Sequence, residues 1–437
     1  RLFGETPFAV RLPSVLAGLA AIILVYLIGK RLYSPMVGLA AASLFAFTVN
    51  HVWISRIGLQ ESIAVALMLA SVYSFLRALD PGTSVVSIGQ STDTSKNPAN
   101  AWPEIGDPRW FIAAGALLGL TFLTKYLALI LIPIFLSLAV VHRYSTYAYD
   151  RNYKWNWRYL LSATAVFLVV ASPVIIYNIQ LYRNFGHFDF QFSQLFGQNV
   201  EAWQAHPGQE VLGSYGERIR TFLPRLIEAN SPYFLILAAA GLVTIFWELI
   251  RRHQHVIRNS SFVIRRYSHS SFVVFLAWLL PFLVFIGPAH RFLTLLTPWL
   301  AIAAGYAITR LNYSQILKNL RIVPVAISIV VTIEAAYAYS SVIALDPVGP
   351  QPWAHSYLRR QAGSWGFSEL NGYLDAELAG KMPDPAVTFE FPFTKKILDQ
   401  SIAEGRLAGR EPVSVGIIYN DNINLSSPLW VFLRRIV

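Results

Sequence analysis

Apolar runs of membrane-spanning length recur along this chain and constrain its fold more than any other feature. A transmembrane helix needs roughly 17 to 25 predominantly apolar residues, and about ten runs approach or reach that length. They cover residues 12–28, 36–54, 59–76, 110–124, 126–141, 159–176, 233–250, 272–286, 292–308 and 322–344. Hydrophobic residues make up 55% of the 437 positions and charged residues only 14%, where about 25% charged is usual in a soluble domain. We therefore predict an all-α polytopic membrane bundle of about ten transmembrane helices.

The basic residues between these runs predict the orientation of the bundle. If the loop with Lys30 and Arg31 is cytoplasmic, the loops on its side hold 17 Lys and Arg, against 9 in the opposite loops and their flanks. Positive charge is concentrated in cytoplasmic loops, so this assignment is the favoured one. The net charge of +11 is spread over loops and forms no single basic face, which argues against nucleic acid as a partner.

Two polar stretches divide the apolar runs. Residues 80–109, rich in Gly, Ser, Thr, Asn and Pro, indicate a cytoplasmic loop. Residues 180–230 indicate an external loop, in which 217–227 has the pattern of an amphipathic helix lying on the membrane surface.

The hydropathy falls from residue 346 onward. We therefore predict two domains: a transmembrane domain at 1–345 and a small extracytoplasmic soluble α/β domain at 346–437. Within the second, the patterns indicate helices at 364–378 and 427–436 and a strand at 413–419. The chain starts at Arg1 without a methionine and still contains apolar residues at its end, so we expect it to be a fragment of a longer protein. It contains no cysteine, which excludes disulfides and thiol chemistry within it.

Charged residues at membrane depth are costly, so those at the outer ends of the runs are the first candidates for a site. The predicted topology places one carboxylate and several cations on the outer side, a pattern expected of a site for an anionic lipid phosphate. These residues are Arg56, Glu61, Lys125, Asn178, Arg183, His290 and Arg291.

Each of these residues also has a purely structural interpretation. A single Arg or Lys near a helix end is typical of a side chain that reaches for the interface. Glu61 could instead be a buried partner of Arg56, and His290 an interfacial histidine held by hydrogen bonds. The signal is that all of them fall on one side of the membrane.

Several of the same stretches resemble one glycosyltransferase family. They read RLFG at 1–4, AVRLPS at 9–14, LIGKRLY at 27–33, SRIGLQE at 55–61, GALLGLTFLTKY at 115–126, SP at 172–173 followed by Asn178, NFG at 184–186, and HRF at 290–292 before Pro298. Their order and spacing resemble the dolichyl-phosphate-mannose protein mannosyltransferase and aminoarabinose transferase family of GT-C glycosyltransferases. The resemblance runs from Arg1 to about Ala344, and is only loose in the tail.

The resemblance implies an inverting transfer of a sugar, hexosyl, mannosyl or aminoarabinosyl, from a polyprenyl-phosphate donor to a protein, lipid or glycan acceptor. It assigns Glu61 to the family's second acidic position, which is frequently Asp, as the catalytic residue present here. The resemblance implies that the lipid phosphate, or the part of the substrate next to it, is bound by Arg56, Lys125, Tyr126, Asn178, Arg183, His290 and Arg291. It requires no metal and no cofactor. The family's principal catalytic Asp precedes the stretch that opens at Arg1, which leaves open whether this stretch is active by itself.

Further expectations follow for location and for competing functions. The resemblance implies a multi-pass protein of the plasma membrane that works on the outer face. A transporter or flippase of a lipid-linked or anionic substrate would also have many helices and membrane-level charges. A structural subunit that presents the tail to partners would predict no cavity around Glu61. The transferase hypothesis predicts that Glu61, Lys125 and Arg291 line one cavity that opens to the outer side and has a lipid-facing entrance, and this cavity is the feature that separates the hypotheses.

Overall fold

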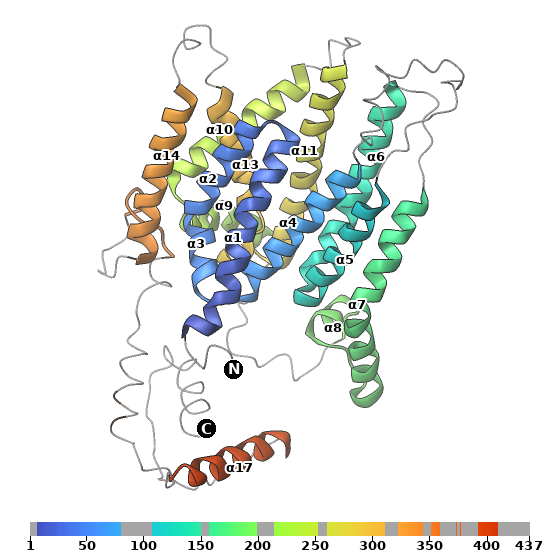
Figure 1. Ribbon diagram of the computed structural model, residues 1–437, viewed down its shortest axis with the longest axis vertical. Coiled ribbons are helices and arrows are strands. Elements are labelled where there is room, and N and C mark those ends of the chain that lie inside the picture. Colours follow the sequence, from blue (N-terminus) through green and yellow to red (C-terminus); the bar gives the residue numbers. More distant parts are fainter. Residues whose placement is uncertain are drawn as a thin grey trace, which may run out of the picture. The chain divides into compact units, whose positions relative to one another are not determined.

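The structure is a computed structural model of the chain (Figure 1). It describes residues 7–79, 107–149, 157–198, 214–251, 260–310, 322–343, 351–358 and 392–409, with the single positions 373 and 376. The chain divides into two compact units, Arg1–Ala362 and Gly363–Val437.

The described part of the first unit is a bundle of helices and contains no strand. The helices are α1 (Pro7–Leu32), α2 (Pro35–Phe47), α3 (Val49–Arg56), α4 (Gln60–Ala78), α5 (Pro108–Thr124), the 3₁₀ helix η3 (Tyr126–Ile130), α6 (Leu131–Tyr149), α7 (Trp157–Phe185), α8 (Phe190–Leu195), α9 (Tyr215–Ala229), α10 (Pro232–Arg251), α11 (Ser260–Ile286), α12 (His290–Leu293), α13 (Thr297–Arg310), α14 (Ile322–Ala338) and the π-helical turn η8 (Tyr339–Ile343).

Each of the ten predicted apolar runs is largely helical. Among the residues that the structure describes, seven helices are long and apolar enough to cross a membrane, and there are up to eight if α2 and α3, bent by 57° at Thr48, form one span. The chain is thus a multi-pass membrane protein, whereas the number of ten spans stays a prediction. Two runs form shorter helices, α5 with 17 residues and α13 with 14.

Helix α13 lies in the middle of the bundle and packs against both α2 and α10. Small residues allow this close approach, as is usual between helices in membranes. A Cβ atom on Gly241 of α10 would lie 1.9 Å from the carbonyl oxygen of Ala303, and one on Gly305 would lie 2.8 Å from the backbone nitrogen of Ala41. Glycine is therefore required where these backbones touch.

Replacing Gly241 by Ala is expected to destabilise the bundle by about 1–3 kcal/mol, because the added methyl group overpacks the α10–α13 contact. Thermal unfolding in detergent would measure the loss. The matched control is Gly216→Ala in α9, where the nearest atom to the new Cβ is the Ser214 Oγ at 4.0 Å. Equal melting temperatures for the two variants would contradict the assigned packing.

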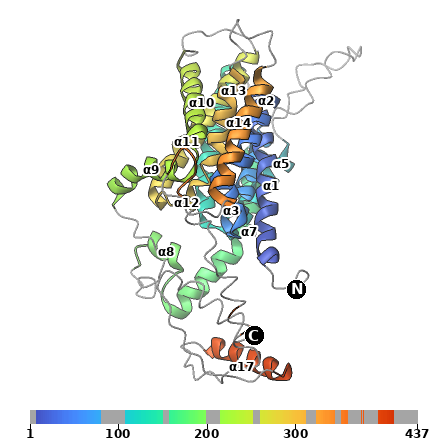
Figure 2. The same cartoon turned by 90° about the vertical axis from the view of Figure 1, so that its left-hand side faces the viewer.

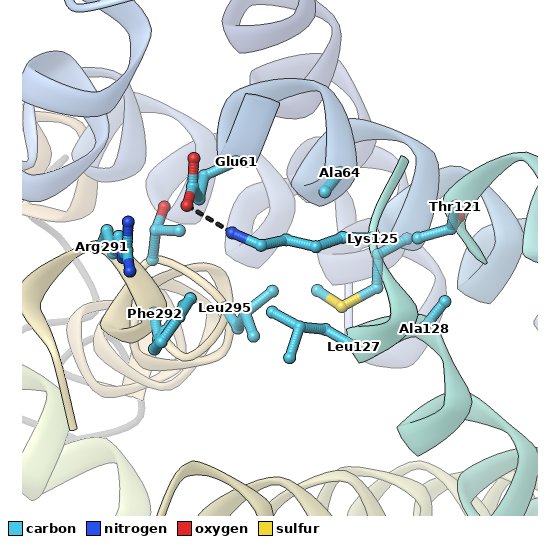
Figure 3. A pocket seen from close by; sticks show the side chains of 11 residues that line it. Glu61, Ala64, Thr121, Lys125, Leu127, Ala128, Arg291, Phe292 and Leu295 are labelled. Atoms are coloured by element: carbon cyan, nitrogen blue, oxygen red, sulfur yellow. Dashed lines mark hydrogen bonds and ion pairs between the residues drawn. The ribbon is translucent and has the colours of Figure 1, made fainter. Parts of the chain in front are cut away.

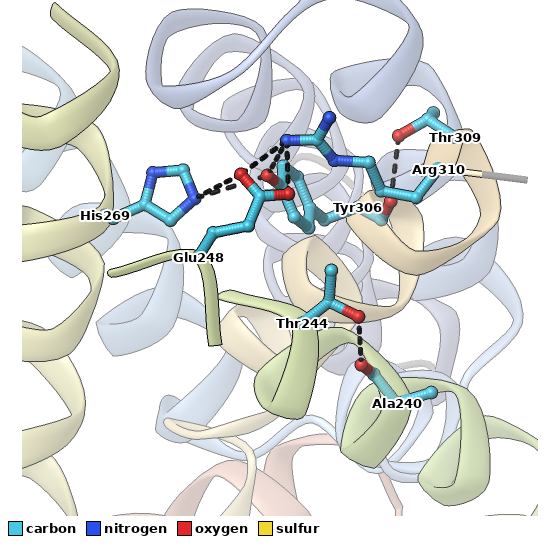
Figure 4. A network of polar contacts seen from close by, with 7 residues as sticks. All are labelled: Ala240, Thr244, Glu248, His269, Tyr306, Thr309 and Arg310. Atoms are coloured by element: carbon cyan, nitrogen blue, oxygen red, sulfur yellow. Dashed lines mark hydrogen bonds and ion pairs between the residues drawn. The ribbon is translucent and has the colours of Figure 1, made fainter. Parts of the chain in front are cut away.

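A polar cluster joins α10, α11 and α13 near the C-terminal end of α10 (Figure 4). The Arg310 guanidinium lies 2.6 Å from Glu248. The His269 ring lies 3.6 Å from the same carboxylate and 3.2 Å from the Tyr306 hydroxyl. The Tyr33 ring packs on Tyr306 with centroids 4.6 Å apart. This cluster satisfies charged groups that would otherwise be costly inside the bundle.

Residues 351–358, which we predicted as part of the C-terminal domain, pack on the first unit. The backbone N–H of Tyr357 donates to the Glu228 carbonyl at 3.1 Å, and that of Ser356 donates to the Ser341 hydroxyl at 2.9 Å. Leu358 is fully buried.

In the second unit the structure describes α17 (Pro392–Leu407). The strand predicted at 413–419 and the helix predicted at 427–436 lie outside the described residues. So does the helix predicted at 364–378, except for positions 373 and 376, which are helical. The mixed α/β character of the tail therefore stays a prediction.

Candidate functional site

Three charged side chains predicted from the sequence line one cavity of the bundle (Figure 3). Glu61 lies on α4, Lys125 lies in the turn after α5, and Arg291 lies on α12. The cavity holds about 340 Å³ of empty space, including its open mouth. Residues far apart in the sequence thus meet at one place, whereas the side of the membrane on which they lie stays a prediction.

Glu61 is placed by the turn that connects α3 to α4. Gly58 has a φ of +72°, a left-handed conformation that glycine adopts without steric cost. The Ser14 hydroxyl of α1 donates to the Leu59 carbonyl at 3.0 Å, and the Ser62 hydroxyl donates to the Ser14 carbonyl at 2.8 Å. These bonds fix the first turn of α4, where the helix dipole favours an acidic side chain.

The carboxylate of Glu61 is only 4% exposed. Its Oε1 accepts a hydrogen bond from the Lys125 ammonium. Its Oε2 is buried and accepts no hydrogen bond from the residues that the structure describes. Burying a carboxylate oxygen without a partner is costly. The alternative of a Glu61–Arg56 pair is wrong, because the ion-pair partner is Lys125.

Lys125 follows the last residue of α5 in an extended conformation, with a φ of −162° and a ψ of 131°. Its side chain therefore leaves the helix and crosses to Glu61, passing 4.9 Å from the centre of the Phe292 ring. Burial lowers the pKa of Lys125, the hydrogen bond and charge of Glu61 oppose this shift, and the charge of Arg291 adds to the lowering. Glu61 thus favours the charged form of Lys125, against the effects of burial and of Arg291.

Arg291 supplies a second cation at the cavity. It lies on α12, is exposed, and stacks its guanidinium 4.9 Å from the Phe292 ring centre. One carboxylate and two cations give the cavity a net positive charge. Guanidinium and ammonium groups are the usual ligands of phosphate oxygens, so an anion fits here better than a cation.

The remaining cavity wall is mainly apolar. It is formed by Ala64, Met68, Leu127, Ala128, Phe292 and Leu295, with the hydroxyl groups of Thr121 and Thr294. The Thr121 hydroxyl donates within its own helix to the Leu117 carbonyl at 2.6 Å. Charged groups on one side and apolar side chains on the other suit an amphiphilic ligand.

Tyr126 and Asn178, both predicted as site residues, donate hydrogen bonds to Asp189, a residue that the sequence analysis did not predict. The Tyr126 hydroxyl donates to Asp189. The Asn178 amide donates to the same carboxylate oxygen at 3.0 Å, and its carbonyl accepts the backbone N–H of Asp189, also at 3.0 Å. This network holds α8 against η3. It thereby fixes the position of Tyr126, which directly follows Lys125.

One feature of the sequence could have indicated Asp189. It is the only acidic residue between Asp150 and Glu201. A lone carboxylate among Phe and Gln residues is a candidate for a specific buried partner.

Removing the Asp189 carboxylate, as in Asp189→Ala, is expected to cost about 1–3 kcal/mol, because the buried groups of Tyr126 and Asn178 lose their acceptor. Asp189→Asn keeps one acceptor oxygen and should restore part of the loss. Thermal unfolding of the two variants beside the parent protein tests this order. If Asp189→Ala melts like the parent, the network does not stabilise the fold.

Five of the seven predicted binding residues do not line the cavity, namely Tyr126 and Asn178, described above, and Arg56, Arg183 and His290. Arg56 donates to the Val342 carbonyl, and Arg183 is exposed on the last turn of α7. The His290 ring lies 3.0 Å from Glu228, and its carbonyl accepts the Asn50 amide at 2.8 Å. The side chains of Arg56 and His290 thus contact other elements instead of the cavity. His290 fits the structural interpretation, a histidine held by hydrogen bonds.

Among the residues that the structure describes, His, Asp and Glu side chains form no cluster of three or more that could hold a metal ion. Cysteine is absent from the sequence.

Solved structures with a similar arrangement include ArnT from Cupriavidus metallidurans in the apo state, at 15% identity and a TM-score of 0.46, covering 98% of this chain and 60% of that one. The Archaeoglobus fulgidus oligosaccharyltransferase in the apo form matches at 13% identity and a TM-score of 0.46, covering 94% of this chain and 51% of that one. This chain thus spans 60% of the first structure's length and about half of the second's. No curated protein matches the chain.

A family sequence profile matches the N-terminal part of the chain. The family is described as dolichyl-phosphate-mannose-protein mannosyltransferase, and the match covers residues 1–87. This segment contains Arg56 and Glu61, whereas Lys125 and Arg291 lie beyond it. The resemblance of the motifs from residue 115 onward stays a prediction. Over residues 1–87 the resemblance drawn from the sequence motifs is confirmed, and this part of the chain carries the sequence pattern of the dolichyl-phosphate-mannose-protein mannosyltransferase family.

Proposed function

We propose that the protein to which this chain belongs is a membrane glycosyltransferase that takes a sugar from a polyprenyl-phosphate donor. The observation that carries the proposal is the cavity in which Glu61, with one unpartnered oxygen, lies beside two cations and an apolar wall. The family match over residues 1–87, which include Glu61, supports it.

The donor is an amphiphile with an anionic phosphate. Lys125 and Arg291 are suited to contact the phosphate oxygens, and the side chains of Met68, Leu127 and Leu295 are suited to contact the first part of the lipid. Because the negative charge on the phosphate grows as it leaves, cations aimed at its oxygens stabilise the transition state more than the bound donor.

The transfer itself forms a bond between an acceptor hydroxyl oxygen and the anomeric carbon. The bond between that carbon and the phosphate oxygen breaks, and the polyprenyl phosphate leaves with the electron pair. The acceptor proton passes to a carboxylate base. We infer that Glu61, the carboxylate among the residues that line the cavity, takes this proton. Displacement from the face opposite the phosphate inverts the anomeric centre.

The protein is proposed to work in the plasma membrane, with the cavity and the C-terminal unit on the outer face. The excess of Lys and Arg in the opposite loops supports this orientation. The acceptor is a hydroxyl or amine of a protein, lipid or glycan.

A test uses membranes that contain the full-length protein and a panel of radiolabelled polyprenyl-phosphate sugars, including mannose and aminoarabinose donors. We expect label to move from one donor to an acceptor that mass spectrometry then identifies. Membranes without the gene are the control. If no donor loses its sugar in a gene-dependent way, the proposal is wrong.

The competing hypothesis of a transporter or flippase is less well supported. Glu61 lies in the first turn of α4 and Lys125 directly after the last turn of α5, so the charges are at helix ends and not at the middle of spans, where transporters bind their substrates. Gene-dependent movement of a fluorescent lipid-linked sugar across liposomes, without any sugar transfer, would favour the transporter instead.

A further inference from the structure

Helix α9 exposes an apolar stripe that no part of the described chain covers. Tyr215, Ile219, Leu223 and Ile227 recur at every fourth position and are between 42% and 63% exposed. Residues four apart lie on one face of a helix. The sequence pattern predicted an amphipathic helix at 217–227, and the helix is confirmed with the bounds Tyr215–Ala229.

A different face of α9 packs on the bundle. Leu226 and Ala229 are buried, and Phe222 packs against the core. A guanidinium nitrogen of Arg218 donates to the Phe285 carbonyl at the end of α11, at 2.5 Å. A third face carries the exposed polar residues Glu217 and Arg220. The described part of the protein thus covers only part of the apolar surface of α9. The uncovered part lies between the face that packs on the bundle and the polar face.

The position of α9 in the chain indicates what covers the stripe. Only Asn230 and Ser231 separate the end of α9 from Pro232, the first residue of the candidate membrane span α10. Figure 2 shows α9 lying across the long axes of α10 and α11. A helix that runs across the spans directly at the end of one of them lies along the membrane boundary, where apolar side chains meet acyl chains and arginines meet headgroups.

We propose that α9 is an interfacial helix whose stripe of Tyr215, Ile219, Leu223 and Ile227 inserts between the lipids of the adjacent leaflet, with Arg220 facing the headgroups and water. The helix is also connected to the candidate site. Glu228 of α9 lies 3.0 Å from His290 of α12, and the next residue on α12 is Arg291. The lipid surface thereby holds the element that carries one of the two cations of the cavity.

The absence of cysteine from the chain allows a direct test. Single cysteines at Leu223 and at Arg220 are labelled with an environment-sensitive fluorophore in the full chain, reconstituted in nanodiscs of phosphatidylcholine and phosphatidylglycerol. Lipids brominated on their acyl chains are expected to quench the Leu223 label roughly twofold or more, because the stripe reaches about 5–10 Å into the boundary. The Arg220 label, on the same helix, should change little. A label at Ile219 repeats the measurement at a second stripe position.

Two outcomes would overturn the proposal. Equal, water-like emission from the labels at Leu223, Ile219 and Arg220 would place α9 away from the membrane. Labels at Leu223 and Ile219 that are shielded from water but insensitive to brominated lipid would show a protein partner on the stripe. Cross-linking between the introduced cysteines would then identify that partner as a second copy of the chain.

Discussion

Replacing Lys125 by Met in the full-length protein is expected to reduce sugar transfer about 10²–10³-fold. Removing one fixed donor that stabilises a developing negative charge typically costs a factor of this size. The methionine fills a similar volume, so the apolar cavity wall formed by Met68 and Leu127 stays in place. Initial rates with the donor identified in the panel assay measure the effect.

The same substitution also removes the ion-pair partner of a buried carboxylate. Leaving a buried charge unpaired costs about 3 kcal/mol or more, so the variant should also melt at a lower temperature. The double variant Lys125→Met, Glu61→Gln removes both charges and should regain stability without regaining transfer. This combination separates loss of catalysis from loss of folding.

Two further variants sharpen the interpretation for Lys125. Lys125→Arg keeps a cation and is expected to retain more transfer than Lys125→Met. Lys30→Met is the matched control, because Lys30 is an exposed lysine of α1 that lies 5.9 Å from the Tyr26 ring centre and does not line the cavity. If Lys125→Met transfers sugar at the parent rate, Lys125 does not contact the donor phosphate.

Glu61→Gln is expected to lower transfer about 10²–10⁴-fold, the range that a positioned general base contributes. The amide keeps the shape of the side chain and an oxygen that still accepts a hydrogen bond from Lys125, which is the more exposed partner of the pair, so the variant should lose less stability than Lys125→Met. It loses the negative charge, and with it the capacity to take a proton from a hydroxyl near Oε2. The measurement is the transfer rate at saturating donor, together with the melting temperature.

Glu61→Asp is the informative companion variant. It restores the charge on a shorter side chain, and the related family frequently has Asp at this position, so we expect transfer between that of Glu61→Gln and that of the parent. Glu404→Gln is the control, because Glu404 is exposed on α17 in the second unit. Transfer by Glu61→Gln at the parent rate would remove Glu61 from the mechanism.

The sequence alone determined the helical membrane architecture, because apolar runs of this length have no stable alternative to helices that span or line a bilayer. It also predicted Glu61, Lys125 and Arg291 on one side of the membrane, from the alternation of the predicted spans, and the structure brings these three residues to one cavity. Only the tertiary structure decided which side chains meet. Arg56 and Glu61 are close in sequence, yet the short turn at Gly58 directs them to different elements, Arg56 to Val342 and Glu61 to Lys125.

The sequence did not indicate the role of Asp189 for the same reason, because its contacts form only in the folded bundle. Asp189 joins Tyr126 and Asn178, residues 63 and 11 positions away in the chain, and no local pattern encodes such a contact. The lengths of α5 and α13 were also decided by packing, since α13 is almost fully buried among other helices and need not match the bilayer by itself. Hydrophobicity and charge determine which segments enter the membrane and from which side, whereas the direction of each polar side chain depends on partners that only the folded bundle supplies.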